Sequence, residues 1–278
     1  MRKKKEGLGS TFSNLQGLPP KVGSSILAKG LIKNFGEGRN TLHALGPLDI
    51  NIRSGEFVTI IGPSGCGKST TMLLVAGLEP TTNGTIKING EELAAPLSDI
   101  GIVFQDHLLL DFRSAINNVM IQQEIRGLNK VDVKERAREL FDRLGLSGSE
   151  DLYPRQLSGG MRQRVSLARA LVHDPSMLLM DEPFGALDAI TRTQIRHDLE
   201  ILWMETKKTV LFITHSIEEA VGLSDRVLVM SKSPGIFVEE IIIDLPRPRP
   251  AHLGEYPEFS KYAQRIYSIF EKLGVYKF

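Results

Sequence analysis

Glu56-Phe-Val-Thr-Ile-Ile61 followed by Gly62-Pro-Ser-Gly-Cys-Gly-Lys-Ser69 decides the fold of this chain. The first stretch is short, apolar and rich in β-branched residues, which is typical of a strand that is buried on both faces of a sheet. The second fits the pattern G-x-x-x-x-G-K-[ST], in which backbone amides turn inward to bind phosphate oxygens. A helix is predicted from Lys68 to about Ala76, and its N-terminal dipole adds to the anion site. Together these signals predict an α/β protein that binds a nucleotide.

Each position of this phosphate loop has a predicted task. Lys68 is expected to reach the β- and γ-phosphates and Ser69 to offer its hydroxyl to Mg²⁺, with Thr70 on the α-phosphate side. Cys66 has no evident base partner in the sequence, so we expect it to contribute its backbone amide and not a nucleophilic thiol. The loop residues expected to contact the nucleotide are Gly62, Pro63, Ser64, Gly65, Cys66 and Gly67.

The composition is that of an ordinary globular protein. The 278 residues are 41% hydrophobic and 24% charged, with a net charge of +1, which gives no sign of a nucleic-acid surface. The single cysteine excludes an intramolecular disulfide and favours a reducing compartment. No apolar run approaches the roughly 20 residues that cross a bilayer. A membrane role therefore requires a partner.

Strand-like segments lie on both sides of a helical stretch. Before it, strands are expected at 26–32, 48–53, 56–61, 85–88 and 100–104. After it, they are expected at 177–180, 210–213 and 226–230, with an edge strand at 236–243 and a helix over about 188–205. Between about 110 and 172 the apolar residues recur at helical spacing, which predicts an inserted helical subdomain.

The two ends of the chain lie outside this core. Residues 1–24 read as a flexible leader, and the basic run Arg2–Lys5 within it as a solvated terminus, the alternative being contact with anionic lipid or nucleic acid. The core domain is predicted over 25–245. In the tail of 246–278, the segment Pro246-Arg-Pro-Arg-Pro250 reads as a stiff linker to a final helix near 259–273.

Met177-Leu-Leu-Met-Asp181-Glu182 is a second chemical signal, because it places two acids at the end of a buried strand. Mg²⁺ usually takes one or two carboxylates together with phosphate and water oxygens. Asp181 is expected to hold the ion, and Glu182, which points elsewhere, to polarise the attacking water. Two ordinary surface acids are the alternative interpretation, and the phosphate loop in the same chain disfavours it.

Leu157-Ser-Gly-Gly-Met-Arg-Gln-Arg164 resembles the LSGGQ signature of the ABC ATPases, with Met161 in place of the usual glutamine. The resemblance extends over about 26–245 and implies a P-loop NTPase core. That core has a mixed, largely parallel sheet with flanking helices, an antiparallel β edge and an inserted helical subdomain. Ser158, Gly159 and Gly160 open a helix to about Leu171 and so form a second anion-binding helix end.

Further residues match family positions one at a time. Gln105 resembles the Q-loop glutamine that senses Mg²⁺ and the permease, and His215 the switch histidine at the γ-phosphate; a structural histidine is the alternative. Asp188 resembles the D-loop aspartate at the dimer interface, with helix N-capping as a competing or concurrent role. Phe35 stands where the family places an aromatic ring on adenine, the alternative being an ordinary edge or core phenylalanine.

The family resemblance also implies the working assembly. Two copies form a head-to-tail dimer in which each signature closes on the ATP held by the other copy. The dimer lies on the cytoplasmic face of the membrane, bound to separate permease subunits and served indirectly by an extracytoplasmic solute-binding protein, with no nucleic-acid partner. The tail Asp244-Leu-Pro-Arg-Pro-Arg249 and the phrase Phe104–Leu110 resemble the nitrate, sulfonate and taurine importers, although Asp111-Phe112 replaces the Pro-Trp frequent in that group.

The sequence leaves three other functions open. One is a soluble ABC ATPase without a transporter, which is disfavoured because the chain has neither a long coiled-coil insertion nor tandem cassettes. Another is a regulator that binds nucleotide without hydrolysing it, which is disfavoured because Glu182, His215 and the signature are all intact. An exporter is a third, milder alternative.

Overall fold

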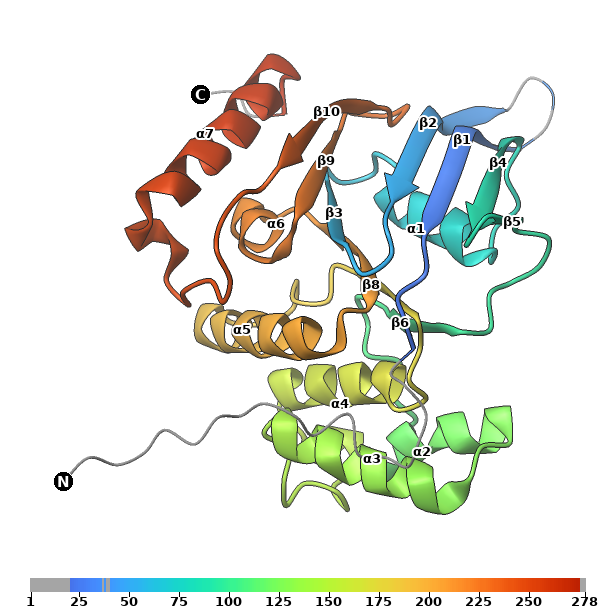
Figure 1. The fold of residues 1–278 in the computed structure, drawn as a ribbon, viewed down its shortest axis with the longest axis vertical. Coiled ribbons are helices and arrows are strands. Elements are labelled where there is room, and N and C mark those ends of the chain that lie inside the picture. The colour runs from blue at the N-terminus through green and yellow to red at the C-terminus, as the bar shows by residue number, and fades with distance from the viewer. Residues whose placement is uncertain (1–20, 37, 39–40, 276–278) are drawn as a thin grey trace.

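The computed structural model describes residues 21–36, 38 and 41–275, and its centre is a six-stranded sheet in the order β10-β9-β3-β8-β7-β6 (Figure 1). Its strands are β3 (Phe57–Ile61), β6 (Ile100–Val103), β7 (Met177–Asp181), β8 (Thr209–Thr214), β9 (Arg226–Met230) and β10 (Phe237–Ile242). All pairs are parallel except β10 with β9. Every residue of β3 and β8 is buried, as the apolar runs predict for strands that are covered on both faces.

A smaller antiparallel sheet lies beside this one in the order β2-β1-β4-β5. Its strands are β1 (Ile26–Phe35), β2 (Leu42–Ile52), β4 (Asn83–Ile88) and β5 (Glu91–Glu92). Helix α1 (Lys68–Ala76) shares one apolar cluster with both sheets, since Met72 and Val75 pack with Ile26 of β1 and Ile60 of β3. The burial of this cluster fixes the helix that starts at the phosphate loop.

The predicted start of the second strand was wrong. We expected it at Leu48, but β2 begins at Leu42 and pairs there with Phe35, the last residue of β1. Irregular register between β1 and β2, together with Gly46 and Pro47 within the strand, hides the alternation of apolar and polar residues on which the prediction depended. Phe35 therefore lies at the end of a strand and not in a loop.

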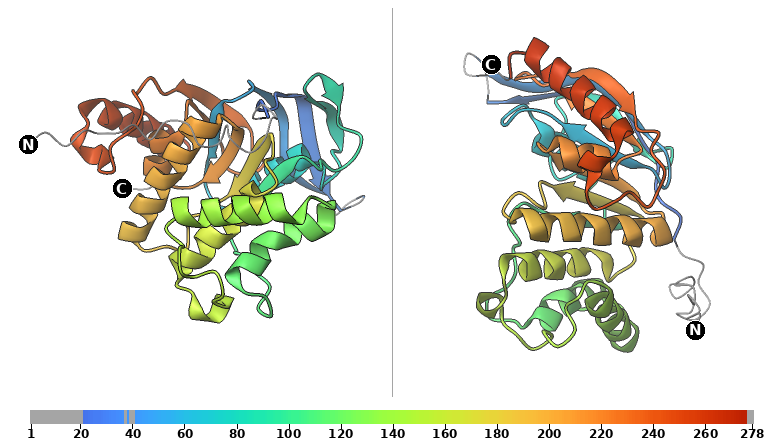
Figure 2. Two further views of the ribbon diagram at one scale, coloured as in Figure 1. Left: turned by 60° about the horizontal axis from the view of Figure 1, so that its bottom comes forward. Right: turned by 90° about the vertical axis from the view of Figure 1, so that its left-hand side faces the viewer.

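A layer of helices replaces strands between β6 and β7, as predicted (Figure 2). It contains α2 (Ala115–Arg126), α3 (Lys130–Arg143) and α4 (Gly159–Leu171), with a short 3₁₀ turn at Pro154–Gln156. The apolar faces of these helices form one core with α5 (Ala189–Thr206) and with the sheet residues Phe57 and Phe212. This core joins the helical layer to the strands that carry the predicted site.

The C-terminal part of the chain adds helices against β9 and β10. Helix α6 (Ile217–Leu223), which the sequence prediction missed, packs with α7 (Pro257–Lys272) through a cluster that includes Val221, Ile241, Ile266 and Phe270. A 3₁₀ turn at Leu253–Glu255 precedes α7. With only seven residues, α6 is too short to show helical periodicity in the sequence.

Residues 246–251, which we call the C-terminal strap, are held tightly to α5 and α6. Arg249 is only 2% exposed and donates hydrogen bonds to the carbonyls of Val221 (2.7 Å) and Ser224 (2.9 Å). Burial, reinforced by the charge of Arg247, lowers the pKa of Arg249 to about 10. Glu200 of α5 accepts from the Arg247 guanidinium and from the Arg249 backbone amide, both at 3.0 Å. The predicted stiff linker is thus fixed to the body of the protein.

Replacing Arg249 with Met should lower the free energy of unfolding by about 1–3 kcal/mol, because two buried carbonyls lose their donor. Arg265→Met is the matched control, since the Arg265 ion pair with Glu239 is largely exposed and should contribute less than about 1 kcal/mol. Urea unfolding followed by tryptophan fluorescence measures both changes. Equal midpoints for the two variants would contradict the role given to the strap.

Most of the predicted leader, including the basic run Arg2–Lys5, lies outside the described residues. Its last four residues, 21–24, contact the body: Lys21 forms an ion pair with Asp99 (2.7 Å), and the Ser24 hydroxyl donates to that of Ser176 (2.8 Å). No helix in the part of the chain that the structure describes is long and apolar enough to cross a membrane.

Candidate nucleotide-binding site

The phosphate loop Gly62–Ser69 connects β3 to α1, as predicted. Gly65 and Gly67 adopt φ angles of +75° and +102°, which strongly favour glycine. The N-cap of α1 is Gly67, which has no side chain to accept from the first amides of the helix, so these amides are available to an anion. A side chain at Gly62 would meet the Cys66 sulfur at 2.9 Å. The glycines therefore allow both the tight turn of the loop and its close packing.

The side chains of Lys68 and Cys66, two residues of this loop, are both buried. The Lys68 ammonium donates to the carbonyls of Gly62 (2.9 Å) and Pro63 (3.0 Å) and is 5% exposed. The Cys66 side chain is 1% exposed, and burial raises the pKa of its thiol. A buried thiol with a raised pKa is a poor nucleophile, in keeping with a backbone role for Cys66.

The two acids at the end of β7 differ in their surroundings. Burial raises the pKa of Asp181, and a hydrogen bond from Ser69 opposes this shift. The Asp181 Oδ1 atom is buried, and within the described part of the chain it has no hydrogen-bond partner. A carboxylate oxygen held in this way, beside the hydroxyl of the phosphate loop, suits a Mg²⁺ ion that completes its shell with phosphate and water oxygens.

Glu182 points away from Asp181 and meets two other predicted residues. Its Oε2 lies 2.9 Å from Nδ1 of His215, and its Oε1 lies 3.7 Å from the Lys68 ammonium. The φ angle of Glu182 is +43°, an uncommon conformation for a residue with a side chain. The fold thus brings Lys68, Glu182 and His215 together at the carboxyl ends of β3, β7 and β8. His215 is also 56% exposed and accessible to a ligand.

Gln105 follows β6 and lies at the same edge of the sheet. A β-carbon added to Gly185 would lie 4.0 Å from the Gln105 Nε2 atom and 4.0 Å from the Glu182 Oε2 atom. Beyond Gln105, the segment 107–114 is fastened by polar side chains that the sequence prediction missed. The Gln163 side chain contacts the His107 ring (2.6 Å). The Asn118 side chain accepts from the Leu110 backbone amide (2.7 Å) and donates to the Leu110 carbonyl (3.1 Å).

The predicted second anion site lies at the start of α4. Ser158 is the N-cap and accepts from the Met161 amide (3.2 Å), and the helix begins at Gly159. Figure 1 shows α4 in the helical layer, whereas α1 lies among the strands. The two glycines differ: a side chain at Gly160 would meet the Thr191 methyl at 2.5 Å, while the nearest atom of the described chain to one at Gly159 would be the tip of Arg162, at 3.9 Å. Packing within the chain therefore explains why residue 160 is glycine, but it does not explain the glycine at residue 159.

Replacing Gly160 with Ala should lower the free energy of unfolding by about 1–2 kcal/mol, because the new methyl group separates α4 from α5. Thr191→Ser removes the opposing methyl and should restore most of that loss. Gly159→Ala is the matched control and should leave the unfolding midpoint unchanged. Denaturant titrations of the single and double variants measure these changes, and equal effects at the two glycines would refute the packing explanation.

Asp188 and Phe35 are both exposed. Asp188 caps α5 by accepting from the Thr191 amide (3.0 Å), so its capping role is real; this bond lowers the pKa of the Asp188 carboxyl. Phe35 is 39% exposed, and its ring lies under the Lys33 ammonium at 4.8 Å from the ring centre. An accessible ring of this kind can stack on a base.

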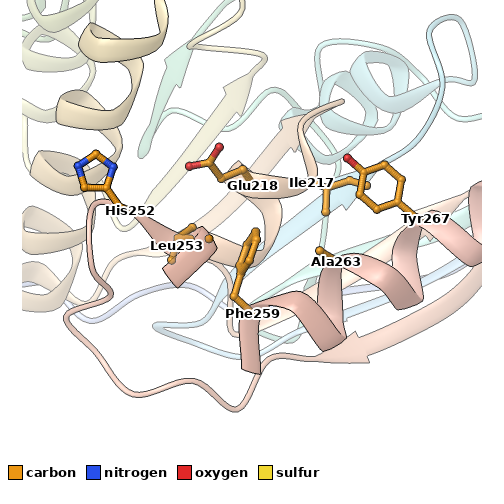
Figure 3. A pocket seen from close by; sticks show the side chains of 8 residues that line it. Ile217, Glu218, His252, Leu253, Phe259, Ala263 and Tyr267 are labelled. Atoms are coloured by element: carbon orange, nitrogen blue, oxygen red, sulfur yellow. The ribbon is translucent and has the colours of Figure 1, made fainter. Parts of the chain in front are cut away.

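A hollow of about 430 Å³ lies elsewhere, between the start of α6 and α7 (Figure 3). Ile217, Glu218, His252, Phe259 and Tyr267 are among its lining residues, and none of the predicted site residues is. The candidate nucleotide site is therefore defined by the edge of the sheet and by the helix ends, and not by this hollow.

A P-loop nucleotide-binding fold with a helical insertion and a second glycine-led helix end defines the class of this protein. Residues 45–185 match the family model described as ABC transporter. The chain belongs to the ABC transporter family, as an ATP-binding protein, which confirms the resemblance and the fold class that the sequence predicted.

The relatives match most of the chain. It is 44% identical over 236 residues to the uncharacterized ABC transporter ATP-binding protein MJ0412 of Methanocaldococcus jannaschii, which covers 85% of this chain and 88% of the relative. It is 39% identical over 246 residues to the aliphatic sulfonates import ATP-binding protein SsuB of Bacillus licheniformis, covering 88% and 94%. The dimeric structure of the ABC transporter cassette MJ0796 matches 80% of this chain and 100% of that chain, with a TM-score of 0.70 and 32% identity. A second match, of equal TM-score and 31% identity, is MJ0796 in a post-hydrolysis state with ADP and Pi.

Proposed function

We propose that this chain hydrolyses Mg-ATP to drive the uptake of a small anionic solute through a separate permease. The observation that carries the catalytic part is the meeting of Lys68, Glu182 and His215 at one edge of the sheet. Glu182 polarises the attacking water as general base, and His215 orients that water and contacts the γ-phosphate. Lys68 neutralises charge on the β- and γ-phosphates. The cassette of known structure that binds ADP and Pi supports hydrolysis in this family.

The metal ion and the nucleotide are held by the phosphate loop and its neighbours. Ser69, Asp181 and Gln105 hold Mg²⁺, which supplies charge neutralisation at the phosphate oxygens when bound. Thr70 lies on the α-phosphate side and Phe35 stacks on adenine. The backbone of the loop lines the phosphates through Gly62, Pro63, Ser64, Gly65, Cys66 and Gly67. The unpartnered Asp181 oxygen and the accessible Phe35 ring support these assignments.

Two copies of the chain form a head-to-tail dimer. Ser158, Gly159 and Gly160 of each copy contact the γ-phosphate in the other, and Asp188 contributes to the interface between them. The glycine at 159, which packing within the chain does not require, supports close approach of a ligand at this helix end. The dimers formed by MJ0796 give the same support from a relative.

The dimer lies on the cytoplasmic face of the membrane beneath permease subunits, with a solute-binding protein acting outside. We assign residues 25–245 to the nucleotide-binding domain, about 110–172 to its helical subdomain, 246–278 to a C-terminal segment and 1–24 to the leader. The similarity to SsuB over almost its full length supports import of an aliphatic sulfonate or a related anion.

The solute assignment is tested by reconstituting the chain in vesicles with the permease and solute-binding protein that co-purify with it. Aliphatic sulfonate, taurine, nitrate and a neutral sugar are then compared as stimulators of phosphate release. We expect one of the three anions to stimulate hydrolysis and the sugar to have no effect. Stimulation by the sugar alone would overturn the anion-importer proposal while leaving the ATPase proposal intact.

Leu108 and Phe112 support a permease contact at the segment Leu108–Phe112, because they are 57% and 74% exposed. Asn118 and Arg169 hold the backbone of this segment in place, which presents its side chains to a partner. Exchanging the segment for that of a relative should change which permease co-purifies with the chain, with the ATPase rate of the isolated protein retained. Unchanged permease binding would refute this assignment.

A further inference from the structure

Two neighbouring helices each begin beside a proposed site residue. Helix α5 starts after Asp188, and α6 starts two residues after His215. In the part of each helix nearest the site, one charged side chain reaches toward the other helix: Arg192 on α5 and Glu219 on α6, with Arg192 Nε and Glu219 Oε1 3.8 Å apart. Neither residue belongs to the motifs from which the site was predicted.

Arg192 is tied to the turn that carries Asp188. Its guanidinium donates to the carbonyl of Leu187 (2.9 Å), and its backbone amide donates to the carbonyl of Asp188 (2.9 Å). The Arg192 Nε atom is buried, has no hydrogen-bond partner among the residues that the structure describes, and lies just beyond hydrogen-bond range of Glu219. A small approach of the two helices is enough to complete that bond.

Glu219 is tied in the same way to the turn that carries His215. Its carboxylate accepts from the Thr214 hydroxyl, and that hydroxyl in turn accepts from the Ser216 amide (3.0 Å). Glu219 and Thr214 are 4% and 1% exposed. Burial raises the pKa of Glu219, while the hydrogen bond from Thr214 and the positive charge of Arg192 favour the carboxylate. His215 therefore lies on a turn in which Thr214 is bound directly to the buried Glu219 carboxylate. Ser216 is joined to that carboxylate through the Thr214 hydroxyl, and its own hydroxyl accepts from the Glu219 backbone amide (3.3 Å).

We propose that Arg192 and Glu219 are positioning residues that couple the Asp188 turn to His215 within one subunit. A shift of Leu187 and Asp188, as when a second copy closes on the nucleotide, is transmitted through the Arg192 guanidinium to Glu219 and so to Thr214 and Ser216. The pair adjusts the switch histidine without touching the nucleotide. This inference rests on the proposed roles of Asp188 and His215.

A purely structural pair would support α5 and α6 without affecting turnover selectively. Four variants of the full chain separate the two cases: Arg192→Gln, Arg192→Lys, Glu219→Gln and His215→Ala. Glu219→Gln keeps the acceptor for Thr214 and removes the charge, and Arg192→Lys keeps the charge. Gln194→Ala is the matched control, because Gln194 lies on the exposed side of α5 and its side chain donates to Asp198 in the next turn (2.8 Å).

Steady-state phosphate release at varied ATP, together with thermal unfolding, reads out each variant. We expect kcat to fall about tenfold or more in Arg192→Gln and Glu219→Gln, because a small misplacement of a site residue costs much of its effect. KM for ATP should stay within about twofold, since no group on the nucleotide is lost. Arg192→Lys should recover part of kcat, and Gln194→Ala should match the wild type.

The double variant Arg192→Gln with Glu219→Gln adds an independent reading. Residues that act through one contact are non-additive, so the double variant should be no slower than the slower single variant. Multiplied losses, or losses of kcat that follow the change in melting temperature in every variant, would overturn the coupling.

His215→Ala separates this inference from the proposed function. If it hydrolyses ATP at the wild-type rate, the proposed role of His215 is wrong and the coupling falls with it. If His215→Ala is inactive while Arg192→Gln and Glu219→Gln retain wild-type kcat, only the coupling is refuted.

Discussion

Replacing Glu182 with Gln should lower the rate of ATP hydrolysis by about 100- to 10,000-fold, the range attributed to a positioned general base. Gln has nearly the same shape and can still meet His215, which lies 2.9 Å from the carboxylate. ATP binding should survive, because the phosphate loop and Lys68 are unchanged. The variant should therefore accumulate as an ATP-bound dimer.

Phosphate release measures the first effect and size-exclusion chromatography with Mg-ATP the second. Glu218→Gln is the control, since Glu218 is an exposed acid on α6 that points into the hollow of Figure 3 and not into the site. It should retain the wild-type rate. A Glu182→Gln variant that is as active as the wild type would remove Glu182 from the role of base.

Replacing Lys68 with Met should weaken ATP binding by about 100-fold or more, because hydrogen bonds to a charged group contribute about 1.5–3 kcal/mol each, two phosphates lose theirs, and about 1.4 kcal/mol is a factor of ten. The substitution also leaves the carbonyls of Gly62 and Pro63 without the donor that holds the loop. At ATP concentrations well below the weakened dissociation constant the site stays empty, so hydrolysis should be lost there.

Calorimetric titration with a non-hydrolysable ATP analogue measures this affinity. Lys29→Met is the control, because the Lys29 ion pair with Asp49 is exposed and lies outside the predicted site. Its affinity should equal that of the wild type. Unchanged affinity in Lys68→Met would show that the lysine does not contact the phosphates.

The sequence was sufficient to predict the parts of the site that are continuous in the chain. A β-branched run, a glycine loop and a helix follow one another over Glu56–Ala76, so strand, turn and helix could be placed by pattern alone. The acids at the end of β7 could be predicted for the same reason, since an apolar run specifies both the strand and its end.

Contacts between distant segments could not be predicted. Gly159 and Gly160 look identical in the sequence, yet only the second meets Thr191 of another helix. In the sequence, the arginines of the C-terminal strap resemble linker residues. In the structure they contact Glu200 and the carbonyls at the end of α6, which lie far from them in the chain. The long-range pair Arg192 and Glu219 lacks a motif for the same reason. Strand β2 was predicted too short because its register with β1 is irregular.

The central claim is that the glycine loop of one copy and the Ser158–Gly160 turn of another hold the same ATP. Disulfide trapping tests it most directly, in a Cys66→Ser, Glu182→Gln background that leaves no native cysteine. One tagged copy carries Ser64→Cys and a differently tagged copy carries Ser158→Cys; a third protein carries both changes in one chain. We predict an ATP-dependent crosslink between the two tags, and for the third protein a doubly linked dimer. A crosslink that forms only within single chains, or none with ATP present, would contradict the account.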